Sequence, residues 1–140
     1  TKVKPVYQTK FGGSDTPEIE QGNCLAAALA SVFELTLEDV PDFAGEISNG
    51  KWFLHLEQWL ARRNLELMVF PTKGAGWPMG YYLAACKSTT LINPDDGHVV
   101  VMHHGTLVHN PHPHATSIGE IENLWVFVAI DPSKQAWRGD

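Results

Sequence analysis

Residues 22–35 decide the fold: Gly22-Asn23 is followed by the run CLAAALASVFEL, which occupies positions 24–35. The run is apolar nearly all round and holds four alanines, the best helix formers, so it predicts a buried helix. Asn23 is a favoured N-cap residue because its side chain can accept an unpaired N–H of the first turn. Cys24 is therefore expected in the first turn of that helix.

The position of Cys24 matters because a thiol is a weak nucleophile until it ionises. A helix N-terminus favours the thiolate through the helix dipole and its unpaired N–H groups, and the same groups can hold an oxyanion. Cys86 follows an apolar segment instead, and we interpret it as structural. Free cysteine is more often a small buried hydrophobe, so Cys24 needs a partner elsewhere in the chain to be a candidate nucleophile.

The rest of the chain predicts two short helical segments and then strands. Residues 1–23 indicate an extended lead-in with a loop, 37–40 a short helical turn, and 51–63 an amphipathic helix with aromatic residues at helical spacing. Strands are expected over 65–70, 81–85, 89–92, 98–102, 106–109 and 124–130. Helices followed by strands predict an α+β fold, with the first helix packed on an antiparallel sheet.

Composition limits the possible partners. The chain has 140 residues, 44% of them hydrophobic, which suits a single domain spanning 1–140. Its formal net charge is -6 and its ten Lys and Arg residues are scattered, so we expect no nucleic-acid partner. There is no apolar run of about 18 residues and no signal-peptide stretch at the start. We expect no membrane partner, a cytoplasmic location and reduced thiols.

The second half offers a partner for Cys24 in two apolar segments, Gly97 to Met102 and Thr106 to Asn110, joined by His103-His104-Gly105. If residues 103–105 form a three-residue hairpin loop, His98 lies directly opposite Asn110 on the same face of the sheet. The Asn110 oxygen could then accept from one imidazole nitrogen and leave the other to take the Cys24 proton. A two-residue loop would place the two side chains on opposite faces.

These pieces together resemble papain-like cysteine hydrolases, closest to the compact bacterial peptidases that process double-glycine leader peptides and to similar bacterial and phage proteins. The matching pieces are Gly22-Asn23-Cys24 at the start of an alanine-rich helix, residues 37–41 after it, Gly97-His98 at the start of a strand, and residues 108–111 at the end of the next. The resemblance implies a papain-like fold, a catalytic triad of Cys24, His98 and Asn110, and a glutamine upstream of the cysteine that donates to the oxyanion.

Two glutamines compete for the oxyanion role. Gln21 lies only three residues before Cys24, which leaves little chain for its side chain to fold back. Gln8 is followed by a loop over residues 12–20 that could bring it beside the helix, and similar bacterial proteins place this glutamine before a threonine. We therefore favour Gln8, although the spacing departs from the family pattern.

Five histidines between positions 103 and 114 raise zinc as an alternative, since imidazole is a common zinc ligand. The spacing of His109, His112 and His114 falls in a proline-broken segment without a nearby carboxylate or cysteine in a known zinc pattern, so we predict no metal and no other cofactor. His112 is expected to line the substrate cleft. Trp77, in a glycine-rich stretch, is expected to form part of its wall.

The sequence therefore predicts a cysteine peptidase or amidase that cleaves an amide, peptide or isopeptide bond through a thioester. Its partner would be a peptide or protein substrate, or a small amide. Two alternatives stay open: an acyltransferase of transglutaminase-like type, and a non-catalytic binding domain on the same fold.

Overall fold

The computed structural model describes residues 3–17, 20–44, 51–72, 76–91, 93 and 97–134. Its elements are α1 (Cys24–Phe33), the 3-10 helix η2 (Leu37–Asp39), α2 (Trp52–Ala61), β1 (Leu65–Pro71), β2 (Tyr81–Cys86), β3 (His98–His103), β4 (Thr106–His109) and β5 (Ile121–Ala129). The strands form a five-stranded antiparallel sheet in the order β1-β5-β2-β3-β4. The α+β class and the helix packed on an antiparallel sheet are confirmed.

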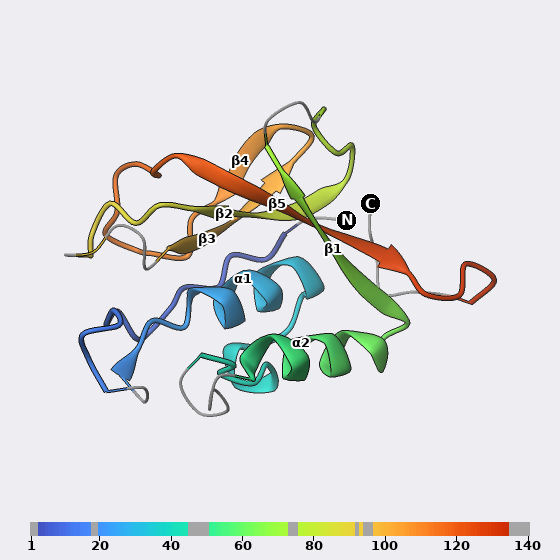
Figure 1. Ribbon diagram of the computed structural model, residues 1–140, viewed down its shortest axis with the longest axis horizontal. Coiled ribbons are helices and arrows are strands. Elements are labelled where there is room, and N and C mark those ends of the chain that lie inside the picture. Colours follow the sequence, from blue (N-terminus) through green and yellow to red (C-terminus); the bar gives the residue numbers. More distant parts are fainter. Residues whose placement is uncertain are drawn as a thin grey trace.

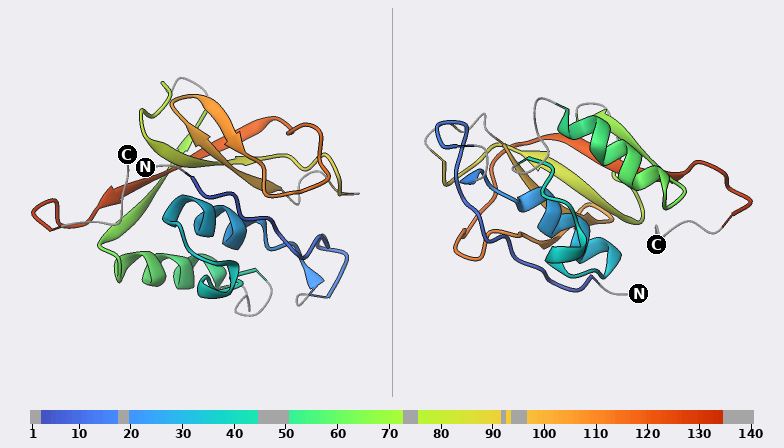
Figure 2. Two further views of the ribbon diagram at one scale, coloured as in Figure 1. Left: turned by 180° about the vertical axis from the view of Figure 1, so that it is seen from behind. Right: turned by 90° about the horizontal axis from the view of Figure 1, so that it is seen from below.

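Both helices lie on one side of the sheet (Figures 1 and 2). Helix α1 packs against β3 and β2, whereas α2 packs against β1 at the other end. The segment before α1 runs beside that helix, where the backbone N–H of Val6 donates to Ser31 Oγ at 2.9 Å. In the described part of the chain, neither helix has the length and apolarity needed to cross a membrane.

Helix α1 is buried along its whole length except at Cys24, as its apolar sequence predicts. It ends at Phe33, two residues before the expected end, because Glu34 adopts the left-handed conformation (φ 56°) and closes the helix. The chain then turns into η2. The nucleophile candidate is therefore the one partly exposed residue of an otherwise buried helix.

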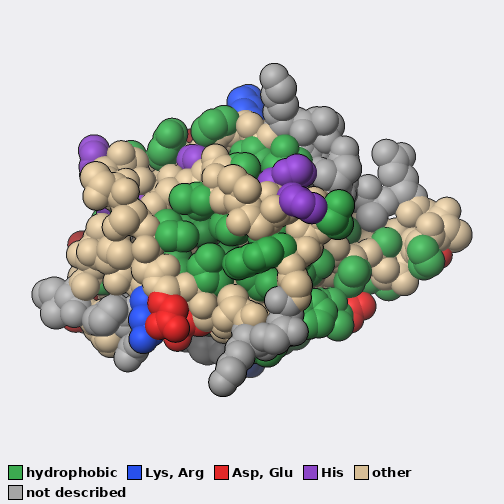
Figure 3. All heavy atoms as spheres, turned by 90° about the horizontal axis from the view of Figure 1, so that it is seen from above, with side chains coloured by type: hydrophobic (Ala, Val, Ile, Leu, Met, Phe, Trp, Pro, Cys, Tyr) green, Lys and Arg blue, Asp and Glu red, His purple; other side chains and the backbone are tan. Residues whose placement is uncertain are grey.

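The two faces of the sheet carry different apolar clusters because side chains alternate along each strand. Leu83, Val99 and Val101 face the helices, whereas Cys86 and Val100 belong to a smaller cluster on the opposite face. Figure 3 looks onto the side turned away from the helices, where hydrophobic side chains gather in the middle. Cys86 thus lies across the sheet from Cys24, and both cysteines are free.

The hairpin between β3 and β4 differs from the predicted one. Its turn has two residues, His104 (φ 48°) and Gly105 (φ 80°), and His103 pairs with Thr106. Two consecutive left-handed residues make the primed turn that matches the twist of antiparallel strands. The expected three-residue loop is therefore wrong, because His104 and Gly105 both adopt the left-handed conformation and close the turn without His103.

A β-bulge compensates for the shorter turn. Met102 pairs with Leu107 but Val101 pairs with His109, so Val108 is an extra residue in β4. Without the bulge, the two-residue turn would leave His98 and Asn110 on opposite faces of the sheet. The extra residue shifts the register by one, so that Asn110 reaches the side of the sheet where His98 lies.

The strand expected over residues 89–92 is also wrong for residues 89–91, and residue 92 lies outside the described residues. Ser88 Oγ accepts hydrogen bonds from the backbone N–H groups of Thr90 (3.2 Å) and Leu91 (3.0 Å). A serine side chain that binds the two following N–H groups forms a turn and removes the donors that a strand ladder needs.

Candidate active site

A pocket of about 370 Å³ opens between the start of α1, the start of β3 and the segment before α1. Its wall contains Cys24, His98 and Gln8, three of the predicted site residues. The stacked indole rings of Trp52 and Trp125, 6.2 Å apart, form an apolar part of the wall. The lining residues in the described part of the chain include no Lys, Arg, Asp or Glu.

Cys24 occupies the first position of α1, as predicted, but its ionisation differs from the expectation. Burial raises the pKa of the Cys24 thiol, and backbone hydrogen bonds from Val99, Leu25 and Cys24 itself only partly oppose that rise. The amides of the helix start therefore do not by themselves create a thiolate, because the loss of water around the sulfur has the larger effect. The resting thiol needs a base.

His98 and Asn110 form the pair that the sequence predicted. The distance between His98 Nε2 and Asn110 Oδ1 is 2.7 Å. Because the amide oxygen only accepts, Nε2 carries the proton and Nδ1 of the neutral ring has a free lone pair. Burial lowers the pKa of His98, and the Asn110 hydrogen bond opposes this shift. His98 is thus a neutral base at pH 7, lining the same pocket as the neutral Cys24 thiol.

His112 lies in the pocket wall next to this pair, as expected for a cleft residue. Its backbone N–H donates to Asn110 Oδ1 at 3.1 Å, so that one amide oxygen accepts two hydrogen bonds. Its ring centre lies 6.3 Å from that of His98 and 5.0 Å from that of Phe11. His112 therefore contributes both a side-chain wall and a backbone contact that fixes Asn110.

Both candidate glutamines line the pocket, and they differ in the contacts of their side-chain amides. A Cβ added at Gly22 would lie 3.7 Å from Gln8 Nε2. That nitrogen donates to the carbonyl of Lys10 at 3.0 Å, which uses one of its two protons, and the buried Oε1 has no partner in the part of the chain that the structure describes. Gln21 instead has a long 3.4 Å contact from Nε2 to the Thr16 carbonyl.

The predicted capping role of Asn23 is wrong. Asn23 occupies the N-cap position of α1, but its side chain makes no hydrogen bond to the first turn. Its Oδ1 accepts instead from the backbone N–H groups of Thr9 (2.9 Å) and Lys10 (3.0 Å). The extended segment before α1 therefore captures the oxygen that the helix would have used, and the first-turn amides of α1 are left to face the Cys24 thiol.

The structure places Trp77 apart from these residues. Its ring lies against Gly105 in the β3–β4 turn, at the end of β3 opposite His98, and it is not part of the pocket wall. The expectation that Trp77 forms part of the cleft wall is therefore not met at the pocket that holds Cys24, because the hairpin turn positions the ring instead.

The histidines between positions 103 and 114 make different contacts from one another. His109 is buried, and its Nε2 lies 2.7 Å from the Val6 carbonyl, whereas His114 donates its backbone N–H to His112 Nδ1 at 3.1 Å. Within the described residues, no three His, Cys, Asp or Glu side chains are arranged to hold a metal ion.

Two contacts that hold the segment before α1 in place were not predicted from the sequence. The contact of His109 with Val6 and the bond from Gln8 N–H to the Pro111 carbonyl (3.0 Å) join that segment to the end of β4. No local pattern could have indicated these contacts, because about 100 residues separate the partners. They place Gln8 beside Pro111, the residue that follows Asn110.

Comparisons of the chain with protein-family models, with curated proteins and with solved structures find no match.

Proposed function

We propose that this chain is a papain-like cysteine peptidase or amidase that cleaves an amide, peptide or isopeptide bond through Cys24, His98 and Asn110. The observation that carries the proposal is the 2.7 Å contact between His98 and Asn110, beside the pocket that also holds the Cys24 thiol at a helix start. These observations support the proposal because the pocket wall supplies a candidate nucleophile and a candidate base, and Asn110 can orient that base.

The chemistry follows from the protonation states. His98 Nδ1 takes the proton of the Cys24 thiol as sulfur attacks the substrate carbonyl, and the carbonyl oxygen becomes an oxyanion. The second Nε2 proton of Gln8 and the Cys24 backbone N–H stabilise that oxyanion. As the intermediate collapses, His98 gives its proton to the leaving amine and a thioester forms. Water then attacks the thioester, gives one proton to His98, and releases the acid while the thiol is restored.

The substrate class is supported by the pocket wall. The described lining carries no formal charge and includes the stacked Trp52 and Trp125 rings, which suits an uncharged segment of a peptide or a small neutral amide. An ionised side chain placed there would lose its hydration without gaining an ion-pair partner from these residues. The proposed substrate is therefore neutral near the scissile bond.

An activated ester tests the reaction without knowledge of the natural substrate. p-Nitrophenyl acetate should acetylate Cys24, release nitrophenolate in a burst, and then turn over as water cleaves the thioester. Peptide mapping by mass spectrometry locates the adduct, and Cys24→Ala should show neither burst nor adduct. A thioester that persists in water but is discharged by an added amine would indicate a transferase, and an inert Cys24 would indicate a binding domain.

A further inference from the structure

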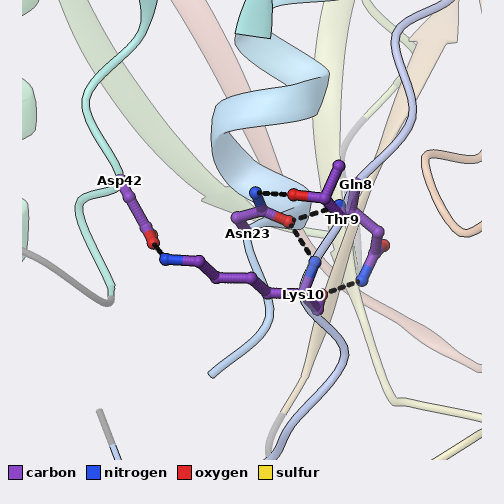
Figure 4. Close-up of polar contacts among 5 residues, drawn as sticks. All are labelled: Gln8, Thr9, Lys10, Asn23 and Asp42. Carbon is purple, nitrogen blue, oxygen red and sulfur yellow. Dashed lines mark hydrogen bonds and ion pairs between the residues drawn. The ribbon is translucent and has the colours of Figure 1, made fainter. Parts of the chain in front are cut away.

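Asn23, the residue directly before the nucleophile, holds the backbone segment that carries the proposed oxyanion donor (Figure 4). It is 6% exposed, and its side chain makes three hydrogen bonds to that segment. Oδ1 accepts from the N–H groups of Thr9 and Lys10 at 2.9 and 3.0 Å, and Nδ2 donates to Thr9 Oγ1 at 3.0 Å. A buried side chain with this many contacts to one backbone segment fixes the position of that segment.

The same segment fixes the side chain of Gln8. The carbonyl of Lys10 accepts from Gln8 Nε2 at 3.0 Å and also receives the longer bond from the Asn23 backbone N–H at 3.4 Å. Lys10 Nζ forms an ion pair with Asp42 Oδ2 at 2.8 Å, which anchors the far side of the residue. The acceptor that orients the Gln8 amide is thus itself held by Asn23.

The Gln8 amide is held in one orientation. Gln8 is 6% exposed and lines the pocket, and its buried Oε1 has no hydrogen-bond partner among the described residues. Because the Lys10 carbonyl must face the NH₂ group, the amide cannot turn to exchange its oxygen and nitrogen without placing two oxygens together. The second Nε2 proton is therefore held in one orientation next to the helix start.

We infer that Asn23 is a positioning residue for the oxyanion donor, linking the Gln8 amide to the start of α1 so that donor and nucleophile keep a fixed separation. This inference rests on the proposed function. Loss of the Asn23 side chain would leave the N–H groups of Thr9 and Lys10 without their acceptor, so the segment that carries the Lys10 carbonyl would be held less firmly. The Cys24 sulfur would keep its own backbone contacts to Val99 and Leu25.

Two reagents separate this role from a general structural one. Acetylation by p-nitrophenyl acetate passes through an oxyanion, whereas alkylation by iodoacetamide displaces iodide and forms none. Asn23→Leu should slow acetylation of Cys24 about 10- to 100-fold, less than the roughly 10²–10³-fold loss known for removal of a whole oxyanion donor. Its alkylation rate should stay unchanged. Asn23→Asp should recover most of the acetylation rate, because a carboxylate accepts from both N–H groups and Thr9 Oγ1 can donate to it.

The double variant tests the route through Gln8. In a Gln8→Ala background, Asn23→Leu should slow acetylation no further, because the donor that Asn23 positions is already gone. Asn64→Ala is the matched control: Asn64 also holds a distant backbone segment, with 2.9 Å bonds to Asp131 N and O, but lies outside the pocket. It should lower the melting temperature and leave the ratio of the two rates unchanged.

Three outcomes would overturn the inference. Equal losses of acetylation and alkylation in Asn23→Leu would mean that Cys24 itself has moved, and unchanged rates in a folded variant would mean that Asn23 positions nothing. If Asn23→Leu does not fold, Thr9→Val removes only the contact with Nδ2 and must still lower the ratio of acetylation to alkylation; an unchanged ratio refutes the role. A wild-type protein that is alkylated but never acetylated would instead refute the proposed function, and the inference with it.

Discussion

Replacement of Asn110 by alanine tests the geometry on which the proposed triad depends. Asn110 Oδ1 accepts from His98 Nε2 at 2.7 Å and from the His112 N–H at 3.1 Å, so the substitution leaves two partly buried donors without an acceptor. A net hydrogen bond contributes about 0.5–1.5 kcal/mol, and a buried unpaired donor costs about 1–3 kcal/mol. We expect Asn110→Ala to lower the free energy of unfolding by about 2 kcal/mol.

The effect on the reaction is separate from this loss of stability. Without the Asn110 oxygen, the His98 ring can rotate and its proton can move to Nδ1, the nitrogen that must accept from Cys24. We expect acetylation of Cys24 by p-nitrophenyl acetate to slow about 10- to 100-fold, which corresponds to roughly 1.4–2.7 kcal/mol of activation free energy. The loss should be smaller than that of Cys24→Ala, because thiol and imidazole can still meet part of the time.

Asn110→Asp provides the discriminating variant. A carboxylate accepts the same two hydrogen bonds, so much of the acetylation rate should survive. Its negative charge favours the imidazolium and raises the pKa of His98, so the acidic limb of the pH–rate profile should move to higher pH. A folded Asn110→Ala protein that is acetylated at the wild-type rate, or an Asn110→Asp profile with an unmoved limb, would refute the assignment of Asn110 as the group that orients His98.

Three further measurements test the site, and a fourth tests its boundary. Iodoacetamide near neutral pH should modify Cys24 much faster than Cys86, because Cys86 is 1% exposed whereas Cys24 lines the pocket together with the proposed base His98. His98→Ala should slow the Cys24 reaction, and equal rates for the two thiols would contradict the nucleophile assignment. Burial lowers the pKa of His98, so acetylation should persist as the pH falls below about 6.5, the ordinary histidine value, and a limb above it would contradict the neutral base. Elemental analysis should find well under one equivalent of zinc, and a chelator should leave folding unchanged. A stoichiometric metal would instead indicate that the 109–114 segment is a metal site. Trp77→Ala should leave the acetylation rate unchanged, because the Trp77 ring packs on the hairpin turn. A large drop in the acetylation rate would indicate that Trp77 contributes to the substrate cleft.

The helix and the order of the elements could be predicted from the sequence because both depend on local patterns. An apolar alanine-rich run forms a helix in most surroundings, and β-branched alternation between turn residues forms strands. The hairpin was harder, since its turn length and the bulge at Val108 are two errors of register that offset each other. The contact between His98 and Asn110 was thus expected from a register that does not occur. The two residues lie on the same side of the sheet, as expected, but not directly opposite each other.

The hydrogen-bond partners of Asn23 could not be predicted from the sequence. Asparagine is a favoured residue at the N-cap of a helix, and that preference is local. In the structure, however, the Asn23 oxygen accepts from the backbone N–H groups of residues 9 and 10 instead of from the first turn of α1. The pKa of Cys24 also depends on a local and a non-local effect. The amides at the helix start are local and lower the pKa, whereas the packing of distant residues removes water from the sulfur and raises it by more. The sequence by itself determined which residues could carry a nucleophile, a base and an amide donor. Only the tertiary structure decided which donor meets which acceptor, since hydrogen bonds and desolvation depend on partners that the chain brings together from distant positions.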